Sequence, residues 1–186
     1  LGNTMPPKSD EPRKPIYTKP ENSVRQGGDN IASATVIPAI PFAATGTTQG
    51  FTDDYNVACP YTATGGLDVV YAFTPAADIA INIDICASDY DTKLYVFETD
   101  QSNSIACNDD WCGSTTYMSY LENVQLTAGL TYYIVIDGYS AADFGTYYLD
   151  ITEYEQVICD IECPVGSIPE GEPCAGDNYV DLINGG

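Results

Sequence analysis

Two cysteines, an asparagine and two adjacent aspartates occupy the six-residue stretch CNDDWC, residues 107–112. Deprotonated cysteines are metal ligands. Carboxylates can act as general acids or bases, and they can bind hard cations. Two cysteines so close in sequence can also close a turn as a disulfide. The stretch therefore allows three interpretations: a metal site, a catalytic acid cluster or a disulfide-closed turn.

The composition argues against catalysis. The chain has no histidine, so no imidazole can activate a serine or cysteine nucleophile. A serine–lysine pair would need Lys93, which falls in a run typical of a strand. A glycosidase needs one acid whose pKa is raised by an apolar pocket, whereas Asp109 and Asp110 lie in a crowded polar stretch typical of a loop. We therefore expect a protein that is not an enzyme.

The seven cysteines favour disulfides over a zinc site. The spacings of Cys107/Cys112 and Cys159/Cys163 leave a thiolate zinc site open. However, a chain rich in Tyr, Thr, Asp and Gly with almost no Lys is typical of a secreted protein, where disulfides persist. Connectivity does not follow from sequence alone; the pairs that we expect are Cys59–Cys86, Cys107–Cys112 and Cys163–Cys174, with Cys159 left over.

Acidic side chains also gather in several predicted loops, and Ca²⁺ binds six to eight oxygens from such loops. None of the loops matches an EF-hand. The alternative is that short Asp and Asn side chains cap turns, which we favour for Asp89, Asp91 and Asn108 taken singly. Uncompensated carboxylates repel one another, so for the whole set we expect at least one calcium site. The candidate ligands are first Asp53, Asp54 and Asp68, next Asp109 and Asp110, and then Asn108, Asp89 and Asp91.

The net charge of −21 is unevenly distributed. Residues 1–26 carry five bases and three acids, whereas the other 160 residues carry 24 acids and one base, Lys93. Such a body should repel nucleic acid and anionic membranes, and it should attract cations and the basic segment. No apolar run approaches the roughly 20 residues that span a membrane. The chain starts at Leu1 with no signal-peptide pattern, so we expect a mature chain from which any leader has been removed.

Three parts follow from the pattern along the chain. Residues 1–26 contain five prolines and predict an extended basic arm. Residues 27–155 alternate apolar and polar side chains with period two, and residues 156–186 form a short acidic tail with clustered cysteines. Strands are predicted at 67–74, 79–86, 93–98, 131–138 and 145–152. The run TTYMSYLENVQL suits a strand as well as a helix.

About eight strands in some 130 residues predict an all-β fold, an antiparallel β-sandwich of jelly-roll type. Ile79, Ile81, Ile83 and Ile85 should share one buried face. Most of the fifteen tyrosines should lie in the core or in cross-strand pairs. Trp111 is the one aromatic side chain expected on a turn.

The order of motifs in the body resembles the bacterial pre-peptidase C-terminal domain. The resemblance covers about residues 28–153 and rests on the series DTKLYV…ACNDD…GLTYYIVIDGY…GTYYL. It implies a secreted, non-catalytic β-sandwich module that often binds calcium and sometimes binds polymers. The tail CPVGSIPEGEPC…NYVDLINGG resembles the cysteine-containing connectors that follow such domains. The arm has no counterpart in the family pattern.

These features predict an extracellular structural protein that assembles with copies of itself. The arm should add as a strand to an open sheet edge of a neighbouring body. Repetition of one such head-to-tail contact gives a filament. The arm residues expected to dock are Ile16, Tyr17 and Thr18, together with the bases Arg13, Lys14 and Lys19. The alternative is a carbohydrate- or protein-binding accessory module of a secreted hydrolase or adhesin.

Overall fold

The computed structural model describes residues 26–58, 65–100, 104–112 and 117–155. The chain divides into two compact units, Leu1–Glu155 and Gln156–Gly186, and all the described residues belong to the first. No helix in the described ranges is long and apolar enough to cross a membrane. Apart from the 3₁₀ turn Ile31–Ser33, the regular elements described are strands.

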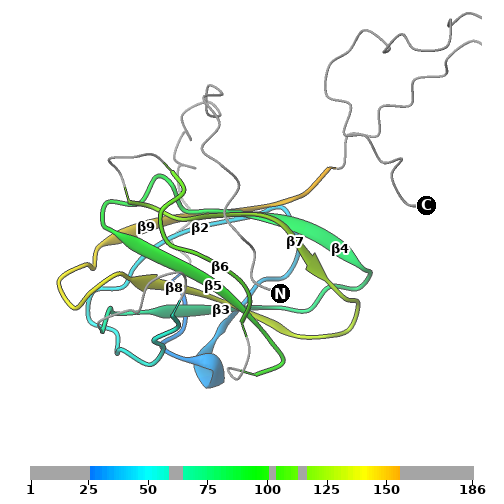
Figure 1. The fold of residues 1–186 in the computed structure, drawn as a ribbon. Coiled ribbons are helices and arrows are strands. Elements are labelled where there is room, and N and C mark those ends of the chain that lie inside the picture. Colours follow the sequence, from blue (N-terminus) through cyan, green and yellow to red (C-terminus); the bar gives the residue numbers. More distant parts are fainter. Residues whose placement is uncertain (1–25, 59–64, 101–103, 113–116, 156–186) are drawn as a thin grey trace, which may run out of the picture. The chain divides into compact units, whose positions relative to one another are not determined.

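Nine strands form two sheets that lie one above the other (Figure 1). The five-stranded sheet has the order β1-β3-β8-β5-β6, and the four-stranded sheet has the order β2-β9-β4-β7. Every pairing is antiparallel except that of β1 with β3. The strands are β1 (Thr35–Val36), β2 (Phe42–Thr47), β3 (Val69–Phe73), β4 (Ile79–Asp84), β5 (Thr92–Glu98), β6 (Ser104–Asn108), β7 (Tyr120–Leu126), β8 (Tyr132–Gly138) and β9 (Thr146–Glu153). The predicted all-β antiparallel sandwich is confirmed.

The core lies between the sheets and is built from the alternate residues that the period-two pattern picks out. Ile81, Ile83 and Ile85 are fully buried there, and Ile79 packs against the same cluster. Tyr71 and Tyr147 cross the core with their hydroxyls 2.7 Å apart, and the Tyr147 hydroxyl also accepts a hydrogen bond from Gly27 N. The expected common face of the four isoleucines is therefore confirmed.

The outer face of the five-stranded sheet is also covered. Tyr55 packs there with Val70, Tyr95, Phe97 and Val135 in a second apolar cluster. Because β3 is buried on both faces, all five of its residues are buried, and the strand reads as a continuous apolar run. This cover is the reason that polar side chains on the outer face, described below, are buried.

The run that suited either a strand or a helix forms β7. A register shift between Ile81 and Ile83 of β4 places one extra residue in β7, and Asn123 there has a φ of 55°. This bulge puts two exposed residues between the buried Leu121 and Val124. A three-residue spacing of apolar side chains imitates a helix, which explains why the sequence pattern alone did not decide.

Candidate functional site

Three of the eight predicted calcium ligands meet at one edge of the five-stranded sheet. Asp91 immediately precedes β5, and Asp109 and Asp110 immediately follow β6. Since β5 and β6 are antiparallel neighbours, with Leu94 opposite Asn108, the start of one strand lies beside the end of the other. Carboxylate oxygens of the three aspartates all lie within 4.8 Å of one another. We call these three residues the aspartate cluster.

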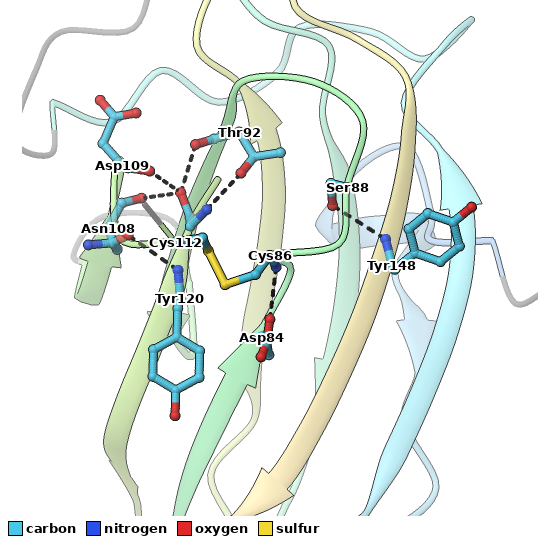
Figure 2. The surroundings of a disulfide bond; sticks show 10 residues. Asp84, Cys86, Ser88, Thr92, Asn108, Asp109, Cys112, Tyr120 and Tyr148 are labelled. Atoms are coloured by element: carbon cyan, nitrogen blue, oxygen red, sulfur yellow. Dashed lines mark hydrogen bonds between the residues drawn. A yellow bond between two sulfur atoms is a disulfide. The ribbon is translucent and has the colours of Figure 1, made fainter. Parts of the chain in front are cut away.

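Burial within the aspartate cluster is graded. Asp109 is 1% exposed, Asp91 is half-buried and Asp110 is exposed. Neither carboxylate oxygen of Asp109 has a hydrogen-bond partner, and Asp91 Oδ1 is also without one. Figure 2 shows the Asp109 side chain directed away from the neighbouring disulfide. A buried carboxylate without partners is costly, so the cluster is a place where the fold lacks a favourable interaction.

Burial and neighbouring acids raise the pKa values of Asp91 and Asp109. Burial is the largest cause that raises the pKa of Asp109 to about 6, with Asp110 adding to the shift and Lys93 opposing it. Burial also raises the pKa of Asp91 to about 7, helped by Asp143 and the other two carboxylates. Two negative charges within 4.8 Å of each other repel by at least ~3 kcal/mol at an effective dielectric constant of about 20. A cation between them would remove this repulsion.

Ser119, in the segment before β7, holds together the two strands that carry the aspartate cluster. The Ser119 hydroxyl lies 2.7 Å from the Thr92 carbonyl and within hydrogen-bond distance of the Asn108 and Asp109 carbonyls. Ser119 N donates to Thr92 Oγ1 at 3.0 Å. These contacts use the backbone carbonyl of Asp109 and leave its carboxylate unused, so the carboxylate does not cap the turn.

The disulfide at this edge differs from the expected pairs. Cys112 is bonded to Cys86, with a Cα–Cα distance of 5.4 Å (Figure 2). Cys107 is disulfide-bonded too, but not to Cys112. The predictions Cys59–Cys86 and Cys107–Cys112 are therefore wrong.

The physical reason is the direction of the Cys107 side chain. Cys107 lies opposite Tyr95 in the sheet and packs with it against the outer cluster. Cys112 has left the sheet after β6, and it reaches Cys86, two residues beyond the end of β4. The bond thus joins the two sheets, instead of closing a turn within one of them.

Two of the predicted ligands cap backbone groups. Asn108 Oδ1 accepts a hydrogen bond from Tyr120 N at 3.2 Å. Asp89 Oδ1 accepts one from Thr146 N at 2.7 Å, at the start of β9. For these two side chains the structure supports the capping interpretation, and Asp89 is not part of the aspartate cluster.

Asp53, Asp54 and Asp68, the first-ranked candidates, lie elsewhere. The exposed Asp53 accepts a hydrogen bond from Asn56 Nδ2, and the exposed Asp54 accepts one from the Thr52 hydroxyl. Asp68 is fully buried, and its Oδ2 accepts the backbone N–H groups of Asp54 and Tyr55. Through these two hydrogen bonds Asp68 anchors the segment that covers the outer face. Burial raises the pKa of Asp68 to about 8.

Sequence reasoning missed a buried pair of oppositely charged residues, Lys93 and Asp137, on the outer face of the five-stranded sheet. Lys93 is fully buried, pairs in register with the equally buried Asp137, and donates from Nζ to the Val57 carbonyl at 3.1 Å. The Tyr95 hydroxyl donates to Asp137 Oδ2. Burial lowers the pKa of Lys93, and the nearby carboxylates of Asp109, Asp137 and Asp91 oppose that shift. The signal available in the sequence was an acid inside the apolar run YYIVID.

Several expectations fall outside the described residues. These are the docking of Ile16, Tyr17 and Thr18, the contacts of Arg13, Lys14 and Lys19, the partner of Cys59 and the pair Cys163–Cys174.

No protein-family model matches the chain. A search of curated proteins finds no match either. Among solved structures, the chain is similar to the pre-peptidase C-terminal domain of a collagenase from Bacillus anthracis. That similarity has a TM-score of 0.42 and 17% sequence identity, and it covers 72% of this chain and 100% of that one. The sandwich is established by its own strands, and membership of that domain family is a proposal.

Proposed function

We propose that this chain is a non-enzymatic extracellular module of the pre-peptidase C-terminal type that assembles with copies of itself through residues 1–26. The disulfides support the extracellular location, because Cys86–Cys112 and the bond of Cys107 need an oxidising compartment. A non-enzymatic role agrees with a chain that has no histidine. A serine–lysine pair would need Lys93 as its base. Lys93 is buried, and its amine donates a hydrogen bond to the Val57 carbonyl, which also agrees with a non-enzymatic role.

The observation that carries the assembly proposal is the opposition of charge between the arm and the body. Within residues 26–155 Lys93 is the single base, and it is fully buried. The charged side chains at the surface of the body are therefore all acidic. Within the described ranges, the edge strands are β1 and β6 in one sheet and β2 and β7 in the other. An edge strand accepts an added strand. Between Pro15 and Pro20, Ile16, Tyr17 and Thr18 suit such an addition.

Deletion of residues 1–26 is the test of this proposal. We expect the full chain to form concentration-dependent assemblies that weaken with salt, because arm bases meet body acids. The deleted chain should stay folded and monomeric in light scattering. A chain in which Arg13, Lys14 and Lys19 are replaced by glutamine keeps the arm's length and should assemble at least tenfold more weakly. If the deleted chain forms the same assemblies, the docking role of the arm is wrong.

An accessory binding module is the second candidate, and exposed aromatic side chains favour it. Tyr117 is 51% exposed in the segment before β7, and Phe144 is 40% exposed. Aromatic rings at a surface can stack on sugars or on a protein partner. This candidate predicts a full chain that is monomeric in light scattering and binds a glycan or matrix protein saturably. The deletion experiment therefore separates the two candidates.

A further inference from the structure

We propose that the outer edge of β2 accepts the arm of a second copy of the chain, with residues 16–19 adding as a strand beside Ala43 and Thr45. This inference rests on the proposed assembly through residues 1–26, and it names the surface that receives the arm. Its basis is a pair of β2 residues whose backbone groups have no strand beside them, together with the place where the arm leaves the body.

The hydrogen bonds at the end of β2 show which way its backbone groups point. Thr48 N donates toward β9, to the carbonyl of the residue before that strand. Thr47 points the other way: its N–H donates to Gln26 Oε1 at 2.9 Å, and its carbonyl accepts from Gln26 Nε2 at 2.8 Å. This direction alternates along an antiparallel strand, and β2 pairs with β9 without a register shift. Ala43 and Thr45 therefore point their N–H and C=O groups away from β9.

These outward groups lie at the end of the four-stranded sheet, where β9 is the one neighbour of β2. Within the described ranges, no backbone or side-chain hydrogen bond reaches the outward N–H or C=O of Ala43 or Thr45. The Gln26 amide occupies the same position beside Thr47, where it replaces one residue of a neighbouring strand. Two residues of the edge, with two donors and two acceptors, are thus left for an added strand.

The other edge strands of the described part carry features that oppose strand addition. Proteins protect sheet edges by short length, bulges, charged side chains or proline. β1 has two residues, and the register shifts place an extra residue in β6 and in β7. β7 also exposes Glu122. β2 has six residues, FAATGT, with no charge, no proline and no bulge, so it is the edge best suited to accept a strand.

The root of the arm is fixed at this same edge. Besides the two bonds between Gln26 and Thr47, Gly27 N donates to the Tyr147 hydroxyl at 2.9 Å. Gly46 makes room for this attachment: a Cβ there would lie 2.2 Å from the Tyr147 hydroxyl and 2.8 Å from Gln26 Oε1. The chain before Gln26 therefore leaves the body at the end of β2.

The position of the root favours a second copy as the donor of the strand. Ala43 lies four positions before Thr47, where Gln26 is bound. A chain that runs straight back from Gln26 along its own β2 passes Ala43 at about residue 22, because both strands rise equally per residue. Its residues 16–19 then lie beyond the first residue of β2. The arm of a second copy has no such restriction.

The composition of the arm segment matches the length of the open edge. Pro15 and Pro20 have no N–H, and they bound the four residues 16–19, which include isoleucine, tyrosine and threonine. In an antiparallel pair every second residue exchanges hydrogen bonds with its partner. The segment therefore presents two residues to β2, which matches Ala43 and Thr45. The bases of the arm then lie against a body whose surface charges are acidic.

Proline at the edge of β2 tests the acceptor. Thr45→Pro or Ala43→Pro removes one outward N–H and leaves the hydrogen bonds to β9 in place. We expect both full-length variants to stay folded in circular dichroism and to assemble at least about tenfold more weakly in light scattering. The control is Gln125→Pro on β7. Gln125 lies opposite Ala80, whose carbonyl accepts Tyr154 N on the β9 side, so Gln125 also points its N–H outward. This variant should assemble as the wild type does.

Hydrogen exchange of the unaltered full chain gives a second measurement that no folding defect can affect. The amides of Ala43 and Thr45 should exchange at least about tenfold more slowly at concentrations where the chain assembles than at concentrations where it is monomeric. The Gln125 amide should exchange at the same rate in both. Residue-level fragmentation in the mass spectrometer separates these amides from their neighbours.

The outcomes separate this inference from the proposed function. Weaker assembly of both β2 variants, with slower exchange at Ala43 and Thr45, supports it. If deletion of residues 1–26 abolishes assembly but the β2 variants assemble as the wild type does, the acceptor edge is wrong and the role of the arm stands. Equal weakening by Gln125→Pro also overturns the assignment to β2. Slow exchange at every concentration would mean that a chain's own arm covers the edge, which overturns the second copy as donor. Assembly that survives the deletion overturns both proposals.

Discussion

Replacement of Lys93 by methionine is expected to lower the free energy of unfolding by about 3–5 kcal/mol. Lys93 is fully buried on the outer face of the five-stranded sheet and is the only base in residues 26–155. Methionine retains most of the volume but leaves the Val57 carbonyl without its donor. It also leaves Asp137, on the neighbouring strand, as a buried carboxylate with no opposite charge beside it.

Urea unfolding in the presence of a chelator measures this loss, because a bound cation would otherwise offset it. The matched experiment adds Asp137→Asn to Lys93→Met. Asparagine can still accept the hydrogen bond from the Tyr95 hydroxyl, and it carries no charge. The double variant should recover at least ~1 kcal/mol relative to Lys93→Met. A cost below about 1 kcal/mol for Lys93→Met would show that Lys93 is not the counter-charge of Asp137.

Removal of the inter-sheet disulfide, by Cys86→Ser with Cys112→Ser, should cost about 3.5 kcal/mol. The bond closes a loop with a sequence separation of 26, and loop-closure entropy of the unfolded chain gives that magnitude. Both cysteines are half-buried, so the serines themselves should cost little. Urea unfolding of the oxidised chains gives the difference, and Cys107 stays bonded in both.

Peptide mapping without reduction checks the connectivity that this prediction assumes. A fragment that joins Cys86 to Cys112 is expected. A fragment that joins Cys107 to Cys112, or a double variant as stable as the wild type, would contradict the role assigned to the bond. Reducing agent is a poor substitute for the double variant, since it also breaks the disulfide of Cys107.

Strand positions could be predicted because they depend on local alternation. The run 79–86 shows this: isoleucine at every second position predicts a strand whose isoleucine face lies in the core, because alternate residues of a strand share one face. The predicted 93–98 and 131–138 correspond to β5 and β8 within one residue at each end. β7 stayed ambiguous because the bulge at Asn123 interrupts the alternation, and a bulge depends on the partner strand β4.

The disulfide pairs could not be predicted because they depend on which strands become neighbours. Nearness in sequence suggested Cys107–Cys112, but Cys107 lies on the outer face with Tyr95, and Cys112 has left the sheet. The burial of Lys93 was missed for a related reason. A lysine in a strand is normally exposed, and only the cover provided by Tyr55 and its neighbours encloses it.

The aspartate cluster was predicted as a set of candidates, without its geometry. Spacing alone could not distinguish Asn108, whose side chain caps Tyr120 N, from Asp109, whose carboxylate has no partner. It could not join Asp91 to Asp109 either, because that contact needs β5 and β6 to be antiparallel neighbours. The first-ranked Asp68 instead anchors the covering segment through the backbone of Asp54 and Tyr55.

We propose that the calcium site expected from the sequence lies at the aspartate cluster, and its most direct test is a crystal of the full chain grown with Tb³⁺ or Ca²⁺. Anomalous difference density should show one ion bound by Asp91, Asp109 and Asp110, with Asp109 carboxylate oxygens about 2.3–2.6 Å from it when the ion is Ca²⁺. Density without an ion at this edge, and with the Lys93 amine bonded directly to the Asp109 carboxylate, would contradict the account.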